Sequence, residues 1–142
     1  MAEVIARERA RQLGWTHVDV ASAGVWAADG QPASPEAVEV AGREGLDLAR
    51  HRSSALSPDR LLETDLILTM GPGHLEALLE SEVAARASTL GAFADGREDP
   101  FDGVAVVDPI GMGLERYEVT FRRLEEAIGM AFARLSPMVG RP

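Results

Sequence analysis

The stretch Asp65-Leu-Ile-Leu-Thr-Met70 limits most strongly what this chain can fold into. It is almost continuously apolar, and strands of that composition are typically buried on both faces of a parallel sheet. Parallel strands need crossover connections, which are usually helices, and helix-like segments lie on both sides of this run. The sequence therefore predicts an α/β fold, a three-layer open parallel sheet with helices on both faces.

The helices are expected from apolar periodicity and from start signals. Residues 2–13 carry an apolar stripe that ends at Gly14, and residues after Met112 repeat an apolar side chain every three to four positions. Ser34-Pro35 and Ser57-Pro58 each place a capping serine before a proline, which predicts helices to Gly45 and Glu63. A fifth helix is expected from the Gly71-Pro-Gly73 turn to about Glu82. The stripe of the last helix comprises Tyr117, Phe121, Leu124, Ile128, Ala131 and Leu135.

Two further strands are predicted besides residues 65–70. Val18–Ser22 alternates apolar and polar residues, and Ser88–Phe93 is a less regular apolar stretch. A unit of alternating strands and helices normally begins with a strand, whereas this chain begins with the helix of residues 2–13, which no capping residue precedes. We therefore expect the first strand of the unit to be missing from these residues.

Composition narrows the function classes. The 142 residues suit one domain, 1–142, and the net charge of −9 argues against a nucleic-acid partner. No apolar run reaches the length of a membrane span, so no membrane partner is expected and a cytoplasmic location is the default. The absence of cysteine excludes a thiol nucleophile within this chain, and the three histidines are too widely spaced to predict a metal site.

Two residues are candidates for chemistry on their own. Asp108, held by Pro109, follows the apolar stretch Val104-Ala-Val-Val107, which predicts desolvation, a raised pKa and a role as general acid. Asp-Pro is also a common turn starter, and Asp99-Pro100 repeats it nearby. Trp26, in a loop rich in small residues, is either a core aromatic or the wall of a binding cleft.

A set of motifs spread along the whole chain resembles the low-molecular-weight protein tyrosine phosphatase family, bacterial type. In order, these motifs are Met1-Ala-Glu3, Val20–Gly24 with Trp26 two residues later, Pro35–Glu39, Gly45–Leu48 with His51–Ser53, Asp65–Met70, and Asp108-Pro109 before Glu115–Tyr117. The family has, before its Met-Ala-Glu helix, an apolar strand and a Cys-x5-Arg phosphate loop. This chain contains neither the strand nor the loop, so the resemblance implies an N-terminally truncated domain.

The resemblance also implies roles for individual residues. Asp108 would be the acid that protonates the leaving oxygen and then activates water, and Trp26 would flank the substrate. Ser22 and His51 would support the phosphate loop through hydrogen bonds. The family's cysteine thiolate takes the phosphoryl group, and the chemistry needs no cofactor.

The implied activity is hydrolysis of phosphotyrosine or phosphoarginine on proteins, with a phosphorylated protein as partner. Without the nucleophile, we expect the chain as it stands to be inactive. A non-catalytic binding module on the same scaffold is the alternative. An arsenate reductase of the same fold ranks last because it needs further cysteines. Loss of a central strand would expose sheet edges, through which a homo-oligomer can form.

Overall fold

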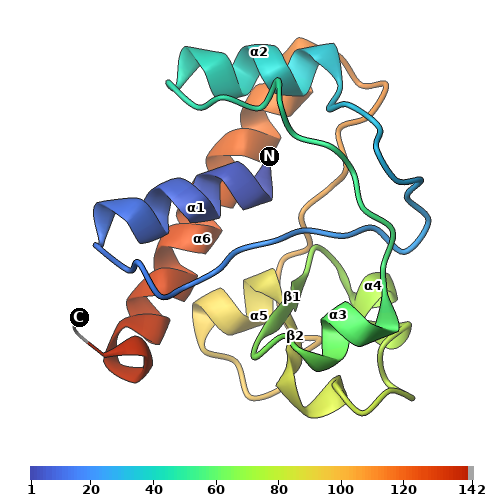
Figure 1. The fold of residues 1–142 in the computed structure, drawn as a ribbon, viewed down its shortest axis with the longest axis vertical. Coiled ribbons are helices and arrows are strands. Elements are labelled where there is room, and N and C mark those ends of the chain that lie inside the picture. The colour runs from blue at the N-terminus through green and yellow to red at the C-terminus, as the bar shows by residue number, and fades with distance from the viewer. Residues whose placement is uncertain (141–142) are drawn as a thin grey trace.

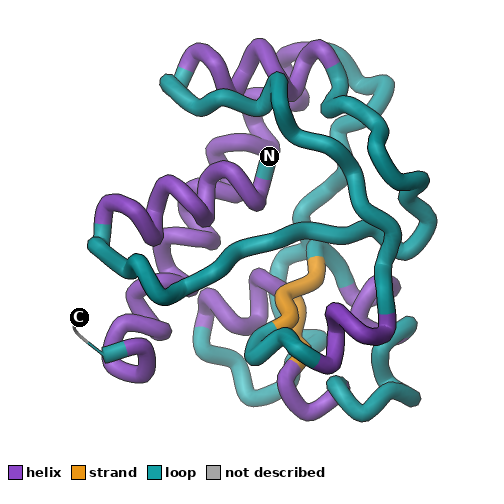
Figure 2. Tube along the Cα trace, in the orientation of Figure 1, coloured by secondary structure: helices purple, strands orange, loops and turns teal. Residues whose placement is uncertain are grey.

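The computed structural model describes residues 1–140 and gives an α/β arrangement of short strands and helices (Figure 1). Its elements in chain order are α1 (Ala2–Gln12), α2 (Pro35–Arg43), α3 (Pro58–Leu62), β1 (Ile67–Thr69), α4 (Pro72–Glu76), a 3-10 turn (Ala84–Arg86), β2 (Ala87–Thr89), α5 (Leu90–Asp95) and α6 (Leu114–Val139). Long loops connect α1 to α2 and α2 to α3, as Figure 2 shows. No helix within residues 1–140 has the length and apolar character needed to cross a membrane.

The sheet of the described residues has two parallel strands, β1 and β2, with Ile67 opposite Ala87 and Thr69 opposite Thr89. Side chains of β1 alternate between two cores, as the pleat of a strand requires. Leu68 and Met70 pack against the larger core, whereas Ile67 packs against the smaller core of Leu75, Leu78 and Ala87. The predicted α/β class with helices around a parallel sheet is confirmed, although the sheet is smaller than expected.

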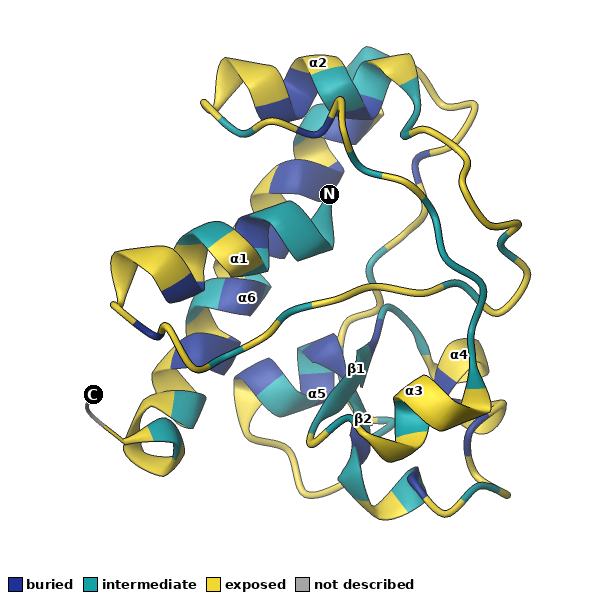
Figure 3. Cartoon of the chain, viewed as in Figure 1, coloured by how far each residue is buried: buried dark blue, intermediate teal, exposed yellow. Residues whose placement is uncertain are grey.

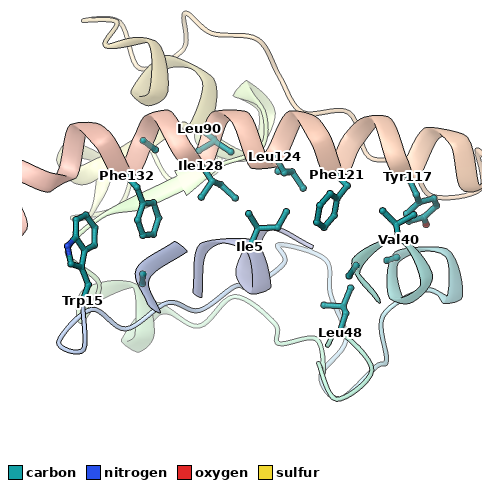
Figure 4. Packing of buried hydrophobic residues seen from close by; sticks show 14 residues of the cluster. Ile5, Trp15, Val40, Leu48, Leu90, Tyr117, Phe121, Leu124, Ile128 and Phe132 are labelled. Carbon is teal, nitrogen blue, oxygen red and sulfur yellow. The ribbon is translucent and has the colours of Figure 1, made fainter. Parts of the chain in front are cut away.

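The larger core is built on α6, which packs against α1, α2 and α5. Phe121 and Leu124 lie in the middle of its buried stripe, opposite Ile5 of α1 (Figure 4). Trp15, just after α1, stacks on Phe132 with ring centroids 5.2 Å apart. Figure 3 shows that the buried positions of α6 repeat along one face of the helix, so the predicted stripe is confirmed.

Local start and stop signals behave largely as the sequence predicts. The Ser34 hydroxyl accepts a hydrogen bond from the amide of Ala37 at 3.4 Å and caps α2. Ser57 precedes α3 without a side-chain cap. The helix after Gly71 is shorter than predicted, because α4 ends at Glu76 and the chain continues in tight turns. Leu75 of α4 and Leu78 of these turns are both buried in the smaller core.

Two of the predicted strands require correction. In the stretch 88–93 only residues up to Thr89 are strand, because the Thr89 hydroxyl accepts from the amide of Ala92 at 3.2 Å and starts α5. The stretch 18–22 is not a strand. Within residues 1–140, no backbone group of Asp19–Ala23 is hydrogen-bonded to another backbone group. A strand exists only with a partner, and this segment has none among the described residues.

Candidate functional site

Two of the predicted site residues, Ser22 and His51, meet at the start of α1. The Ser22 hydroxyl donates to Oε2 of Glu3 at 2.5 Å, and Nδ1 of His51 lies 3.9 Å from the same oxygen. Arg7 pairs with the other carboxylate oxygen of Glu3 at 2.9 Å. Glu3 therefore joins three side chains from α1 and two loops, and its side chain is only 12% exposed.

The first turn of α1 presents free backbone donors beside this cluster. In residues 1–140, the amides of Ala2, Glu3 and Val4 have no hydrogen-bond acceptor, and Met1 supplies no side-chain cap. The positive end of the helix dipole favours a negative charge there, and Glu3 occupies the first turn. Burial lowers the pKa of the Met1 ammonium group, and the Glu3 carboxylate acts against that shift.

Trp26 lies on a loop that is tied to residues 53–56. Gly24 donates to the Ser54 carbonyl and accepts from the amide of Leu56, both at 3.0 Å, and the Asp29 carboxylate accepts from the amide of Ala55 at 2.7 Å. The Trp26 side chain itself is 87% exposed, with its ring 6.2 Å from that of His74 at a tilt of 59°. The sequence allows two interpretations of Trp26, a core aromatic residue or the wall of a binding cleft, and its exposure shows that the first interpretation is wrong.

Asp108 lies on an anchored loop between α5 and α6. The amide of Val106 donates to the Met70 carbonyl at 2.8 Å, Pro109 is buried, and Thr120 of α6 donates to the Val107 carbonyl at 3.4 Å. Oδ1 of Asp108 accepts from the amide of Ile110 at 3.0 Å. The carboxylate is exposed, as are Val104 and Val107, so the expected desolvation by the preceding apolar residues is wrong.

The structure brings Ser22 and His51 together but links neither of them to Asp108 or Trp26 by a hydrogen bond within residues 1–140. Two residues that contact the predicted ones were not given a role from sequence. Glu3 belongs to the Met1-Ala-Glu3 motif, and its acidic position in a first helical turn was the available signal. His74 follows the Gly71-Pro-Gly73 turn, and no sequence signal indicates its contact with Trp26.

The functional groups present in this region limit the chemistry that it can perform. Among the described residues, no group of three or more His, Asp or Glu side chains is arranged to hold a metal ion. The full sequence has no cysteine. What remains is a set of amides and polar side chains around the start of α1, an exposed aromatic ring, and an exposed carboxylate on a fixed loop.

The fold is shared with solved low molecular weight and arginine phosphatases, which defines a phosphatase-type α/β domain, and sequence comparison identifies the family. Residues 1–139 match the family model for low molecular weight phosphotyrosine protein phosphatase. The chain therefore belongs to that family.

Three relatives illustrate the similarity. A probable low molecular weight protein-tyrosine-phosphatase, EpsP, of Ralstonia nicotianae is 32% identical over 113 residues, which is 78% of this chain and 72% of the relative. The solved structure of a low molecular weight protein tyrosine phosphatase from T. tengcongensis matches with a TM-score of 0.84 at 36% identity, covering 94% of this chain and 88% of that one. A YwlE arginine phosphatase mutant, in which a phosphorylated active-site serine replaces cysteine, matches with a TM-score of 0.87 at 27% identity over 98% of this chain and 90% of that one.

Proposed function

We propose that this chain carries the scaffold and the proton-transfer group of a phosphatase that acts on phosphotyrosine or phosphoarginine in proteins. The observation that supports it most directly is the exposed carboxylate of Asp108 on a loop fixed at Val106, Val107 and Pro109. A carboxylic acid in that position can give its proton to the leaving oxygen or nitrogen of a phosphorylated side chain and can then activate water. The fixed backbone holds the acid in place, which favours proton transfer.

Ser22 and His51 act through Glu3 in this proposal. Their contacts to one carboxylate hold the first turn of α1 against the loops of residues 18–24 and 50–53. The first-turn amides then face a phosphate with their donors free. Ser22 and His51 are therefore positioning residues for the phosphate-binding end of α1.

Trp26 is the proposed wall of the substrate site. Its exposed ring offers a face on which a phenyl ring can stack or a guanidinium group can lie. The relatives include both tyrosine and arginine phosphatases by name. Trp26 accommodates either substrate, so it does not separate the two specificities.

The 142-residue chain as it stands should lack the family's covalent step, because it has no cysteine to accept the phosphoryl group. We expect the pure protein not to hydrolyse p-nitrophenyl phosphate above the buffer rate. Hydrolysis that is lost in Asp108→Asn would contradict this expectation.

The role of Asp108 is tested in a fusion that carries the N-terminal segment of the Ralstonia relative upstream of Met1. The fusion should hydrolyse p-nitrophenyl phosphate, and Asp108→Asn in it should lower kcat by roughly 10²–10⁴-fold. Asp99→Asn is the matched control, because Asp99 also precedes a proline and accepts from the amide two residues later, at 2.9 Å. An active fusion that is equally sensitive at both positions, or at neither, would refute the role of Asp108.

A non-catalytic binding module is the second candidate, favoured by the missing nucleophile. Calorimetry of the 142-residue chain with a phosphotyrosine peptide and its unphosphorylated counterpart distinguishes the binding module from the phosphatase. If the chain binds only the phosphorylated peptide, and the fusion described above is inactive, the binding module is favoured. An arsenate reductase ranks below both, since its chemistry needs cysteines that this chain does not have.

A further inference from the structure

Trp26 has one aromatic neighbour in a position that is otherwise open to solvent. Its side chain is 87% exposed, on a loop rich in small residues. Within residues 1–140, His74 carries the one aromatic ring paired with the indole, at 6.2 Å between centroids and a tilt of 59°. Aromatic rings attract each other at centroid separations of roughly 4.5–7 Å. The imidazole of His74 therefore restrains a ring that has little else to hold it.

The backbone that carries His74 is firmly held. His74 belongs to α4, and the residue after it, Leu75, is 1% exposed in the smaller core. At the start of this helix, the Gly71 carbonyl accepts hydrogen bonds from the amide of Leu75 at 3.4 Å and from the Thr69 hydroxyl at 3.1 Å. The imidazole therefore projects from a fixed turn rather than from a free loop.

The same turn is bonded to the loop of Asp108. Met70 lies directly before Gly71, and its carbonyl accepts from the amide of Val106 at 2.8 Å, two residues before Asp108. The loop of Trp26 is attached elsewhere, to the carbonyl of residue 54 and the amide of residue 56. The contact between Trp26 and His74 therefore links the indole directly to the turn that anchors the loop of Asp108.

We propose that His74 is a positioning residue that sets the place of the Trp26 ring relative to the Asp108 carboxylate. The inference rests on the proposed function, in which Trp26 is the wall of the substrate site and Asp108 is the acid. With the imidazole beside it, the indole has fewer rotamers open to it. A phosphorylated side chain then meets a wall that is already in place, so less conformational entropy is lost on binding.

This role has a definite kinetic consequence. The wall touches the substrate side chain in the ground state and in the transition state alike, and loss of such uniform binding raises KM without lowering kcat. A group that moved a proton would instead change kcat. His74 has no hydrogen bond to Asp108 within residues 1–140, which fits a residue that acts on the wall and not on the acid.

The first test is NMR of the 142-residue protein and needs no activity. Nuclear Overhauser effects should connect the imidazole protons of His74 with the indole protons of Trp26. In His74→Ala the order parameter of the Trp26 indole N–H should fall below about 0.6, a value typical of flexible groups, while that of Trp15 stays unchanged. His74→Phe should keep the indole ordered, because it retains a flat ring. His17→Ala is the matched control, since His17 is an exposed histidine that contacts the Val139 carbonyl instead.

The second test is kinetic and uses the fusion with the N-terminal segment of the Ralstonia relative. With a phosphotyrosine peptide, His74→Ala should raise KM about two- to tenfold and leave kcat within about twofold. His74→Phe should restore the KM of the parent fusion, and His17→Ala should change neither constant. Urea unfolding of each variant shows whether the fold is intact, because a substitution at an exposed side chain should alter stability little.

Two outcomes would overturn the proposal. The first is an indole of Trp26 that is equally ordered in the parent chain and in a folded His74→Ala variant. The second is an active fusion in which His74→Ala lowers kcat and leaves KM unchanged, since His74 would then act in the chemistry. An inactive fusion would count against the proposed function alone, because the NMR measurements by themselves decide whether His74 positions the ring.

Discussion

Ser22 and Glu3 are joined by a hydrogen bond of 2.5 Å, which ties the loop after residue 18 to the first turn of α1. The acceptor is a carboxylate, and hydrogen bonds to charged groups are stronger than those between neutral groups. Arg7 neutralises the same carboxylate, and His51 lies beside it. The start of α1 is thus held to the neighbouring loops through its own Glu3 carboxylate, while Met1 supplies no capping side chain.

Replacement of Ser22 by alanine should lower the free energy of unfolding by about 1–3 kcal/mol, because a poorly exposed carboxylate oxygen loses its donor. Urea denaturation followed by circular dichroism measures the change. Ser136→Ala, at an exposed serine of α6, is the control and should change stability by less than about 0.5 kcal/mol. Equal effects at both positions would show that the bond contributes nothing.

Replacement of Phe121 by alanine should destabilise the fold by about 3–5 kcal/mol, since Phe121 is 2% exposed at the centre of the larger core and its loss leaves a cavity. Val119→Ala, on the same helix at a site that is 46% exposed, should cost well under half of that. Thermal and urea unfolding of both variants give the comparison. Similar losses in the two variants would contradict the placement of the α6 stripe.

The two tryptophans should differ sharply in access to solvent. Trp15 is 6% exposed and stacked on Phe132, whereas Trp26 is 87% exposed. Acrylamide should therefore quench the fluorescence of Trp15→Phe, which retains Trp26, several-fold more efficiently than that of Trp26→Phe. Comparable quenching constants would mean that the loop of residue 26 folds over its ring.

Asp108→Asn should leave stability unchanged within about 0.5 kcal/mol. The Asp108 side chain is exposed, and its one hydrogen bond, from the amide of Ile110, can be accepted equally well by an asparagine oxygen. Urea unfolding measures this directly. A large loss of stability would show that Asp108 has a structural role. A loss of activity in the variant could then no longer be attributed to the missing general acid.

Glu8 should titrate at unusually low pH. A side-chain hydrogen bond from Arg11, with a second from Gln12, lowers the pKa of the Glu8 carboxyl from 4.5 to about 2. Because the folded pKa is depressed, the stabilisation is present above the unfolded value of 4.5 and is lost as pH falls toward 2. Arg11 is exposed and Glu8 is half-buried at the surface, so solvent screens the pair and its effect on stability should be small.

NMR titration of the Glu8 carboxyl carbon measures this shift, and Arg11→Gln should move the midpoint upward toward the ordinary value. High salt should act in the same direction, because exposed ion pairs are screened. A midpoint that does not respond to the Arg11 substitution would refute the hydrogen bond as its cause.

Local sequence was sufficient for α1, α2 and α6, although not for α4 and α5. The stripe on α6, the Ser34-Pro35 start of α2 and the stop of α1 near Gly14 depend on interactions within about one turn of the chain. The motifs that identify the family are likewise readable in order from residue 1 to Tyr117, and the match over residues 1–139 agrees with them. These features needed no knowledge of distant contacts.

Tertiary structure decided what depends on partners far away in the chain. Residues 18–22 have the pattern of a strand but are not one, because no other described backbone lies beside them to complete a ladder. Asp108 follows apolar residues that turn out to be exposed, so burial could not be inferred from composition. Ser22 and His51 meet only because both loops return to Glu3, and a hydrogen bond between residues 19 positions apart leaves no local pattern in the sequence.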